Sequence, residues 1–512
     1  MNREHHIVSD QRIAKNALLL YARTFIVLCI SLYISRLVLD ALGAVNVGIY
    51  NVVGGIVTLM AFFQTALIKS TGRFITYDLG AETTIEQKRS TFAACLVIHV
   101  WIALILILLG ETVGLWIFHN YTVIPAERLV AAKIIYQLAL FTFSTQMLSV
   151  PYSAAIIAHE RMSVYAVISI MEAVLRLVGV MIIPFIPGDA LILYGIVVAL
   201  VALVSIGMNM VYVLGKMQEY RTGPSWEKEL STRILAFSGW TMLGSATNTG
   251  TQQGVALLFN NFVSLIANAA LGFANQVNAA LAQFVSSFTT AFNPQVIKLC
   301  AAQDYDALHR LMTMASKISF VLAYIMALPL IVNMDYLLHV WLGNVPQYTT
   351  EFCQLILVCT VIDATTGVYN TAITATGHIR NYQIAISLSF TLDLLIAYLL
   401  LKAHIHPALV FGSRILTRGF INMGIGLYFT RSLVSFDVKR YTMQVLVPIM
   451  IVLLITIPVN YGLNYYFNAL PLLLVSTAVN GIMMIALGYL IVLNASERTA
   501  VKNTIKQKLH VA

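Results

Sequence analysis

The sequence predicts an all-α integral membrane protein of about 14 transmembrane helices, with two pseudo-symmetric six-helix lobes around a central cavity plus two C-terminal helices. Three observations predict this class: a composition too apolar for water, long apolar runs, and an internal repeat. Hydrophobic residues make up 59% of the 512 positions and charged residues 10%, against roughly 25% charged in soluble domains. Runs such as 96–109 do not alternate, which excludes a β-barrel and leaves a helix bundle.

Fourteen apolar stretches separated by polar breaks are long enough to cross a bilayer, which takes about 20 residues of helix. The first follows Arg3, Arg12 and Lys15 and so resembles a signal peptide, but it is longer and has no small-residue cleavage site. We expect it to be retained as a helix. The predicted spans are 16–38, 45–70, 90–118, 128–150, 161–184, 190–215, 233–259, 265–295, 310–334, 350–376, 382–403, 407–430, 441–461 and 470–493.

The basic residues indicate which helix ends face the cytoplasm. With the N-terminus inside, 22 of the 31 Lys and Arg residues fall in predicted inner segments. Short cytoplasmic loops carry the excess of Lys and Arg, so both termini are predicted to be cytoplasmic. Topology thus explains the net charge of +9, and no nucleic-acid partner is expected. The predicted outer loops hold only Arg36, Arg128, Lys133 and Lys402.

An internal repeat divides the chain. An offset of 217 residues aligns Tyr152–Ala158 with Tyr369–Ala375, and the same register aligns Tyr165 with Tyr382. Six spans separate the two copies, so both would have the same membrane orientation, as in transporters built from parallel repeats with a site at the repeat interface. The predicted parts are an N-lobe (1–215), a cytoplasmic inter-lobe linker (216–233), a C-lobe (234–431), and helices 13 and 14 with a cytoplasmic tail (432–512).

Several charged residues fall inside predicted spans, where each needs a partner or a water-filled cavity. Glu172 and Arg176 are four residues apart and share a helix face. The repeat makes Arg176 equivalent to Asp393, and this pair could meet across a central cavity or only join helices. Arg414 and Arg418 are expected to be unpaired, which suits an anionic group such as phosphate. The full set is Arg23, Glu111, Glu172, Arg176, Asp363, Asp393, Arg414 and Arg418.

Polar side chains also follow spans 7 and 8 at near-helical spacing. Gln252, Asn275 and Asn278 are candidate contacts for sugar hydroxyls. Asn and Ser also form hydrogen bonds between helices in membrane bundles, and the sequence leaves both interpretations open.

Motifs for enzyme chemistry are absent from the sequence. It contains no HExxH, GxSxG, Walker-type or CxxC pattern, and its five cysteines fit packing positions better than metal or disulfide sites. The chain is therefore predicted not to be an enzyme and to carry no cofactor or metal. A coupling proton or Na⁺ would be held by Glu111, Glu172, Asp363 or Asp393, which the sequence does not rank.

Scattered motifs resemble one known family. The segments Asp40–Tyr50, Thr65–Arg73, Asn275–Val277, Phe292–Gln295 and Ala375–Gly377 resemble the polysaccharide-transporter branch, which includes the O-antigen (Wzx-type) flippases, of the multidrug/oligosaccharidyl-lipid/polysaccharide (MOP) exporter superfamily. The resemblance extends over essentially the whole chain, although its motifs are loose. It implies two six-helix lobes with a V-shaped cavity, in agreement with the independent count of spans.

The resemblance also implies a function. Such a protein flips an undecaprenyl-diphosphate-linked oligosaccharide, the repeat unit of O-antigen, capsule or exopolysaccharide, across the bacterial cytoplasmic (inner) membrane. It implies that cavity arginines bind the diphosphate; Arg23 matches that role best by position, and Arg176, Arg414 and Arg418 are assigned by location. The expected partners are the lipid-linked substrate and membrane lipid, with a polysaccharide polymerase and glycosyltransferases of the same pathway.

Three other functions remain open at this stage. A peptidoglycan lipid-II flippase shares the helix number and the basic cavity, so the sequence separates it poorly. An ion-coupled drug or metabolite exporter of the same superfamily would favour acidic cavity residues, against the arginines counted here. A membrane polysaccharide polymerase would need a large outer loop or a buried catalytic histidine. The glycan, the coupling ion and the oligomeric state cannot be predicted from these residues.

Overall fold

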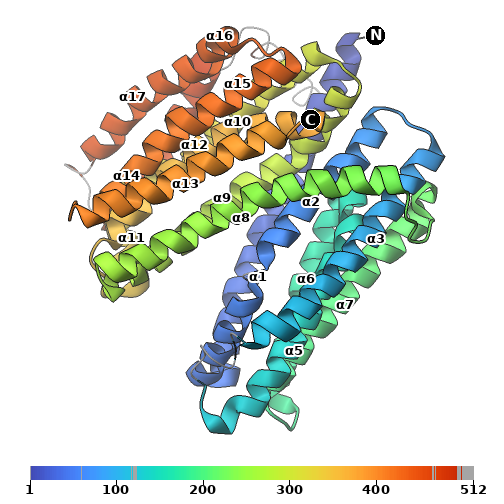
Figure 1. Ribbon diagram of the computed structural model, residues 1–512. Helices are drawn as coiled ribbons and strands as arrows, with labels where there is room; N and C mark the ends of the chain where they lie inside the picture. Colours follow the sequence, from blue (N-terminus) through green and yellow to red (C-terminus); the bar gives the residue numbers. More distant parts are fainter. Residues whose placement is uncertain are drawn as a thin grey trace, which may run out of the picture. The chain divides into compact units, whose positions relative to one another are not determined.

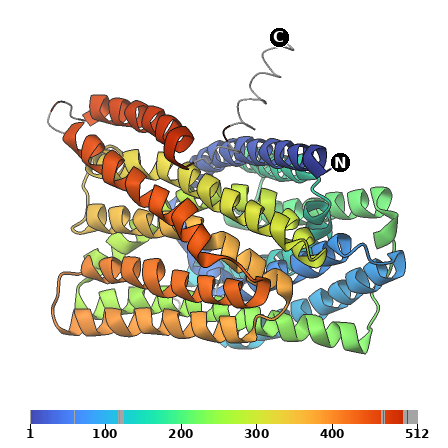
Figure 2. The ribbon, with the colours of Figure 1, turned by 90° about the horizontal axis from the view of Figure 1, so that it is seen from above.

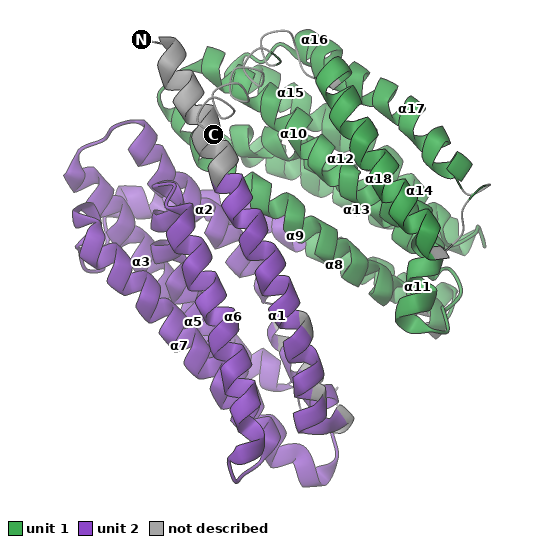
Figure 3. Ribbon diagram, turned by 180° about the vertical axis from the view of Figure 1, so that it is seen from behind, with its two compact units in different colours: residues 1–14, 247–512 green, residues 15–246 purple. Residues whose placement is uncertain are grey.

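The computed structural model describes residues 2–58, 60–116, 118, 124–463, 466, 469–492 and 498. It divides into two compact units: unit 2 holds residues 15–246, and unit 1 holds residues 1–14 and 247–512 (Figure 3). The described part is helical throughout, with no strand (Figure 1). Apart from residue 498, the predicted cytoplasmic tail lies outside the described residues.

Unit 2 is formed by six helices and the first half of a seventh. α8 crosses the unit boundary, which falls between Ala246 and Thr247. The helices are α1 (Asn2–Thr58), α2 (Ala61–Gly80), α3 (Ile85–Leu109), α5 (Leu129–Ala158), α6 (Met162–Ile182), α7 (Ala190–Lys216) and α8 (Lys228–Phe262).

Unit 1 contains the remaining helices, several of which are joined by short π-helical turns. They are α9 (Leu265–Ala301), α10 (Tyr305–Val332), α11 (Met334–Leu342), α12 (Thr349–Thr376), α13 (Arg380–Lys402), α14 (Leu409–Leu416), α15 (Met423–Val434), α16 (Val438–Tyr441), α17 (Val447–Gly462) and α18 (Ala469–Leu487).

Ten helices of the described part are long and apolar enough to cross a membrane. They account for the predicted spans 1, 3–6, 9–11, 13 and 14. The other four predicted spans fall on helices too, but α8, α9 and the α14–α15 segment carry more polar residues. A multi-pass α-helical membrane protein is thus confirmed, while its orientation stays a prediction.

The predicted second span, 45–70, is wrong in its bounds. The predicted break between residues 38 and 45 is present as a sharp bend at Gly43, whose φ of 77° and ψ of 159° interrupt the helix. The next break comes after Thr58, and α2 then continues to Gly80, so Arg73 lies inside a helix. Hydropathy marks apolar length but not the single residue at which a helix bends.

Each unit is organised around one central helix. In unit 2, α5 packs against α2, α3, α6 and α7, and Tyr136 and Met147 are fully buried along it. In unit 1, α12 packs against α9, α10, α14 and α15, and Phe352 and Tyr369 are buried there.

The central helices end in the same way. Tyr152–Ala158 forms the last turns of α5, and its predicted repeat Tyr369–Ala375 lies at the end of α12. Glu160 and Gly377, which are 217 residues apart, both adopt positive φ, 58° and 83°. This shared backbone feature supports the register of the repeat.

The last two helices, α17 and α18, both pack against α10 within unit 1 (Figure 2). Buried polar contacts join them to that helix. Tyr324 and Thr456 share a hydrogen bond of 2.7 Å, and the Asn333 amide donates one of 2.8 Å to Ser476. Asn480 donates to the Ile325 carbonyl at 3.1 Å. Because lipid offers no hydrogen-bond partners, such contacts hold membrane helices together.

Candidate functional site

Arg23 is the basic residue of α1 that the sequence placed in the first span. Its guanidinium carbon lies 5.4 Å from the centre of the Tyr165 ring on α6, within cation–π range. Its Nε atom is buried without a hydrogen-bond partner, and no carboxylate pairs with it in the described part of the chain. An arginine inside a span with unused donors is well placed to bind an anion.

Arg176 lies on the same face of α6 as Tyr165, because positions 165, 169, 172 and 176 repeat at helical spacing. Arg176 Nη2 is 3.8 Å from Glu172 Oε1, which confirms the predicted intrahelical pair. That distance is too long for a strong hydrogen bond, and Arg176 Nε has no partner. Glu172 is held instead by the Ser205 hydroxyl of α7, which donates to it at 3.1 Å.

Two tyrosines complete the surroundings of Arg176. The rings of Tyr50 and Tyr194 lie edge to face with centroids 4.8 Å apart, and the charge of Arg176 acts on both phenols. One face of α6 thus carries a guanidinium near each of its ends, that of Arg23 over Tyr165 and that of Arg176. Tyr165 and Arg176 lie about 16 Å apart along the axis of α6, at 1.5 Å per residue.

Glu111 lies in the π-helical turn Gly110–Gly114 that extends α3. The Tyr136 hydroxyl donates to the neighbouring Gly110 carbonyl at 2.6 Å. The Glu111 side chain is half-buried, and it forms no salt bridge with Arg23 or Arg176 in the described part of the chain. π-Helical turns are frequent at functional sites, and the sequence offers no simple pattern that predicts them.

In unit 1, the expectation that Arg418 is unpaired is wrong, whereas Arg414 forms no salt bridge among the described residues. Arg418, in the π-helical turn Thr417–Asn422, forms a salt bridge to Asp363 of α12. Arg414 is buried near Asp393 of α13, and the Thr417 hydroxyl donates to the Arg414 carbonyl at 3.1 Å. These acids come from neighbouring helices, so spacing along one helix could not reveal them.

The proposed pairing of Arg176 with Asp393 involves residues of different units. Within its own unit each has a neighbour of opposite charge, Glu172 for Arg176 and Arg414 for Asp393. A pairing across a central cavity stays a prediction.

The three candidate sugar contacts have different surroundings. Asn278 accepts a hydrogen bond from the Thr360 hydroxyl of α12, so it joins helices within unit 1. Asn275 is exposed on α9, and Gln252 is exposed on α8 with its amide 3.5 Å from the Asn248 oxygen. Only Asn275 and Gln252 therefore present their amides to the surroundings of unit 1.

One cluster was missed because sequence analysis counted Arg128 only as an outer-loop cation. Arg128 donates to both carboxylate oxygens of Asp189, at 2.6 and 3.1 Å, and to the Asn46 oxygen from Nε and Nη2, at 3.0 and 2.7 Å. Asp189 also caps the N-terminus of α7. Partial burial raises the pKa of Asp189, but Arg128 and the Ile192 and Leu191 N–H groups outweigh it and hold the pKa below its usual value.

No group of three or more His, Cys, Asp or Glu side chains that could hold a metal ion occurs among the described residues. The buried cysteines Cys95, Cys300, Cys353 and Cys359 are free thiols in this part of the chain.

Solved structures share the fold of this chain, although no protein-family model and no curated protein matches its sequence. A MATE protein in its bent conformation aligns with a TM-score of 0.71 and 12% identity. An outward-facing multidrug resistance MATE family transporter of the MOP superfamily aligns at 0.68 and 13%. A MOP superfamily transporter from Pyrococcus furiosus, described as having a binding pocket of reversed polarity that suggests a different function, aligns at 0.69 and 13%.

Each alignment covers 83% of this chain and 96% of the solved one. The chain therefore shares the two-lobed helical fold of these solved transporters, and the predicted all-α membrane fold class is confirmed. At this level of identity the likeness concerns the fold alone.

Proposed function

We propose that the protein flips an undecaprenyl-diphosphate-linked oligosaccharide across a bacterial cytoplasmic membrane by alternating access. The observation that carries this proposal is that two arginines lie along one face of α6, Arg23 of α1 over the Tyr165 ring and Arg176 of α6 itself. Among the described residues, Arg23 has no acidic partner and Arg176 keeps an unused donor. Guanidinium groups bind phosphate oxygens in bidentate fashion, and a diphosphate supplies enough oxygens for two of them.

The positions of the two arginines suit a substrate that moves from one leaflet to the other. Tyr165 lies one turn into α6, at the end predicted to be cytoplasmic, and Arg176 lies nearer the other end. A diphosphate bound first at Arg23 and then at Arg176 would cross much of the membrane while staying in contact with a guanidinium group. The exposed amides of Asn275 and Gln252 suit sugar hydroxyls. A proton or Na⁺ held by Glu111, Glu172, Asp363 or Asp393 would supply the coupling.

The second candidate is an ion-coupled drug or metabolite exporter. The fold favours it, because the MATE structures share that fold. The pairing of Arg418 with Asp363 favours it as well, since it removes one arginine from the basic excess. A peptidoglycan lipid-II flippase would use the same arginines and differ only in the glycan. A membrane polymerase has no supporting site among the described residues.

The deciding experiment deletes the gene in its host and measures surface glycan together with lipid-linked intermediates. The deletion is complemented with wild type, Arg23→Ala, Arg23→Lys or Arg36→Ala at matched expression. Arg36 is the control because it is exposed on the same helix. We expect loss of one surface polysaccharide, accumulation of diphosphate-linked repeat units facing the cytoplasm, and rescue by wild type and Arg36→Ala only.

Other outcomes separate the alternatives. Loss of peptidoglycan precursors at the outer surface would identify the lipid-II flippase. Unchanged glycans with altered drug tolerance would identify the exporter, and Arg23 would then serve only to join α1 to α6.

A further inference from the structure

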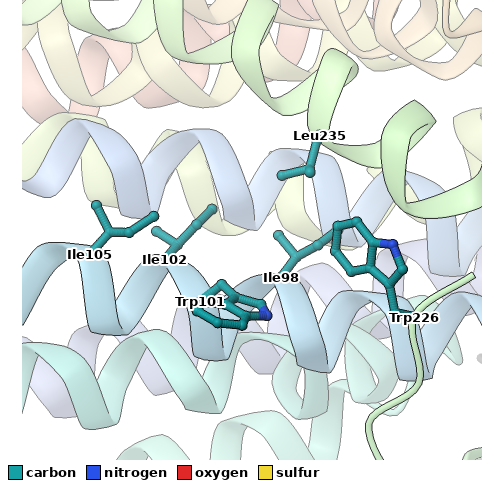
Figure 4. Close-up of a pocket in the computed structure, with 6 residues that line it drawn as sticks. All are labelled: Ile98, Trp101, Ile102, Ile105, Trp226 and Leu235. Atoms are coloured by element: carbon teal, nitrogen blue, oxygen red, sulfur yellow. The ribbon is translucent and has the colours of Figure 1, made fainter. Parts of the chain in front are cut away.

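An apolar groove lies on unit 2, away from the arginines of α6. It has a volume of about 570 Å³, within the range of ligand pockets. Figure 4 shows Trp226 beside Ile98, with Leu235 of α8 above them. The lining residues are Ile98, Trp101, Ile102, Ile105, Trp226 and Leu235.

The groove follows one stripe of α3. Positions 98, 101, 102 and 105 have the i, i+3, i+4, i+7 spacing of a single helix face, which runs for about 10 Å. α3 belongs to a span of mean hydropathy 2.9, so this face meets lipid hydrocarbon. Trp101 is 59% exposed and Ile105 48% exposed, which leaves the groove open on that side. A hydrocarbon chain is therefore the ligand that suits this groove.

One end of the groove is amphipathic. Trp226 comes from the extended connection between α7 and α8, and tryptophan favours the level of the lipid headgroups. Lys228 begins α8 and lies two turns before Leu235 on the same helix face. Lys228 is exposed between the exposed residues Glu227 and Glu229. Arg221 is engaged elsewhere, since it donates to the Leu214 and Gly215 carbonyls at the end of α7.

We propose that this groove binds a zwitterionic aminophospholipid of the membrane. One acyl chain fills the stripe on α3, the phosphate contacts Lys228 and the Trp226 indole N–H, and the headgroup ammonium pairs with Glu227 or Glu229. The alternation of acid, base and acid matches a headgroup with both charges better than a purely anionic one. A bound lipid would join the connection between α7 and α8 to α3. The proposal concerns binding and does not depend on which substrate is transported.

Trp226, one of the two tryptophans of the groove, provides the test. The full-length protein with Trp101, Trp116, Trp240 and Trp341 replaced by Phe keeps Trp226 as its only fluorophore. It is placed in nanodiscs that contain phosphatidylethanolamine or phosphatidylglycerol with brominated acyl chains, which quench tryptophan on contact. We expect brominated phosphatidylethanolamine to bind at Trp226 about fivefold more tightly, as expected for one favourable headgroup charge.

The double variant E227Q/E229Q should remove this preference, because only the headgroup ammonium distinguishes the two lipids, whereas Lys228→Gln should weaken the binding of both, since both carry the phosphate. Lys439→Gln, an exposed lysine at the start of α16, should leave the preference intact. If the single-tryptophan variant does not fold, native mass spectrometry of the wild-type, E227Q/E229Q and Lys228→Gln proteins measures retention of the same lipids. Quenching that follows mole fraction equally for both lipids would overturn the proposal, as would a preference for phosphatidylglycerol. Displacement of the brominated lipid by an isoprenoid diphosphate would assign the groove to that class of lipid instead.

Discussion

The Ser205 hydroxyl donates a hydrogen bond of 3.1 Å to the Glu172 carboxylate and so joins α7 to α6. A second hydrogen bond lies 217 residues further along the chain. There the Ser389 hydroxyl of α13 donates to the Asn422 oxygen at 2.5 Å. Both partners keep the register that aligns Tyr152–Ala158 with Tyr369–Ala375, although donor and acceptor have exchanged helices. The duplicated units thus retain a polar contact at one position while its chemistry differs: in unit 2 it carries a charge, and in unit 1 it is neutral.

Removal of either hydrogen bond should destabilise its unit by a similar small amount. We expect Ser205→Ala and Ser389→Ala each to cost about 0.5–1.5 kcal/mol, because single hydrogen bonds between membrane helices contribute little more. Thermal unfolding in detergent measures the effect. Ser163→Ala, at an exposed position of α6, is the control. A loss of transport in Ser205→Ala without loss of stability would instead assign the Glu172 contact to the transport cycle.

Replacement of Gly43 by alanine should weaken the bend in α1. Its φ of 77° with ψ of 159° is a conformation that only glycine adopts easily, at a cost of about 1–3 kcal/mol for other residues. A Cβ at Gly43 would meet no atom within 4 Å, so the cost comes from the backbone alone. Gly48→Ala is the matched control, because Gly48 is helical and also has open space around it. It should be neutral or stabilising by up to about 1 kcal/mol. Equal stability of the two variants would contradict the bend.

The Arg128 cluster should make the stability of the fold depend on pH in the acidic range. The folded pKa of Asp189 lies below the unfolded value, so the ion pair contributes fully above about pH 4. This contribution is lost as the pH falls through the folded pKa. Asp189→Asn should remove that acid-dependent loss while keeping the N-cap of α7, since Asn caps as well as Asp. Thermal midpoints between pH 3 and 7, a range set by the carboxyl pKa, measure the difference; parallel curves for variant and wild type would refute it.

Arg128→Lys should not restore the cluster. One guanidinium serves both Asp189 oxygens and the Asn46 amide at once, whereas an ammonium is a point charge that cannot match this planar arrangement. We expect Arg128→Lys to lower the free energy of unfolding by nearly as much as Arg128→Gln does. That loss is about 1 kcal/mol for a partly exposed ion pair. A lysine variant as stable as wild type would show that charge alone is sufficient there.

The helices and the repeat could be predicted from the sequence because their causes are local. Apolar length determines a span, and the pairs at 152/369 and 165/382 already set the register that the positive φ values of Glu160 and Gly377 support. The gap between the first two predicted spans contains the bend at Gly43, whereas the break after Thr58 escaped prediction because the predicted span 45–70 runs through it.

The partners of the charged residues were harder to predict. Only the Glu172 and Arg176 pair, four residues apart, was visible in the sequence. Arg418 and Asp363 are 55 residues apart, and Arg128 and Asp189 are 61 apart, so each contact depends on tertiary packing. The one available sign was Asp189 itself, which follows Pro187 and Gly188 and precedes an apolar run, as an N-cap residue does.

The salt bridge between Arg418 and Asp363 should respond unequally to loss of its two members. The Arg418 side chain is 18% exposed and the Asp363 side chain 47% exposed. Asp363→Asn leaves the more buried charge without a counter-charge, whereas Arg418→Gln leaves a carboxylate that solvent still reaches. We therefore expect Asp363→Asn to be the more destabilising variant.

The double variant then shows whether the pair only joins helices or takes part in coupling. If it joins α12 to the turn after α14, the double variant D363N/R418Q should be more stable than the sum of the single effects allows, by about 1 kcal/mol. Transport should recover in parallel, because both charges are gone together. If Asp363 instead carries a coupling ion, the double variant regains stability but not transport. Stability in detergent and transport in proteoliposomes, measured on the same preparations, separate these outcomes.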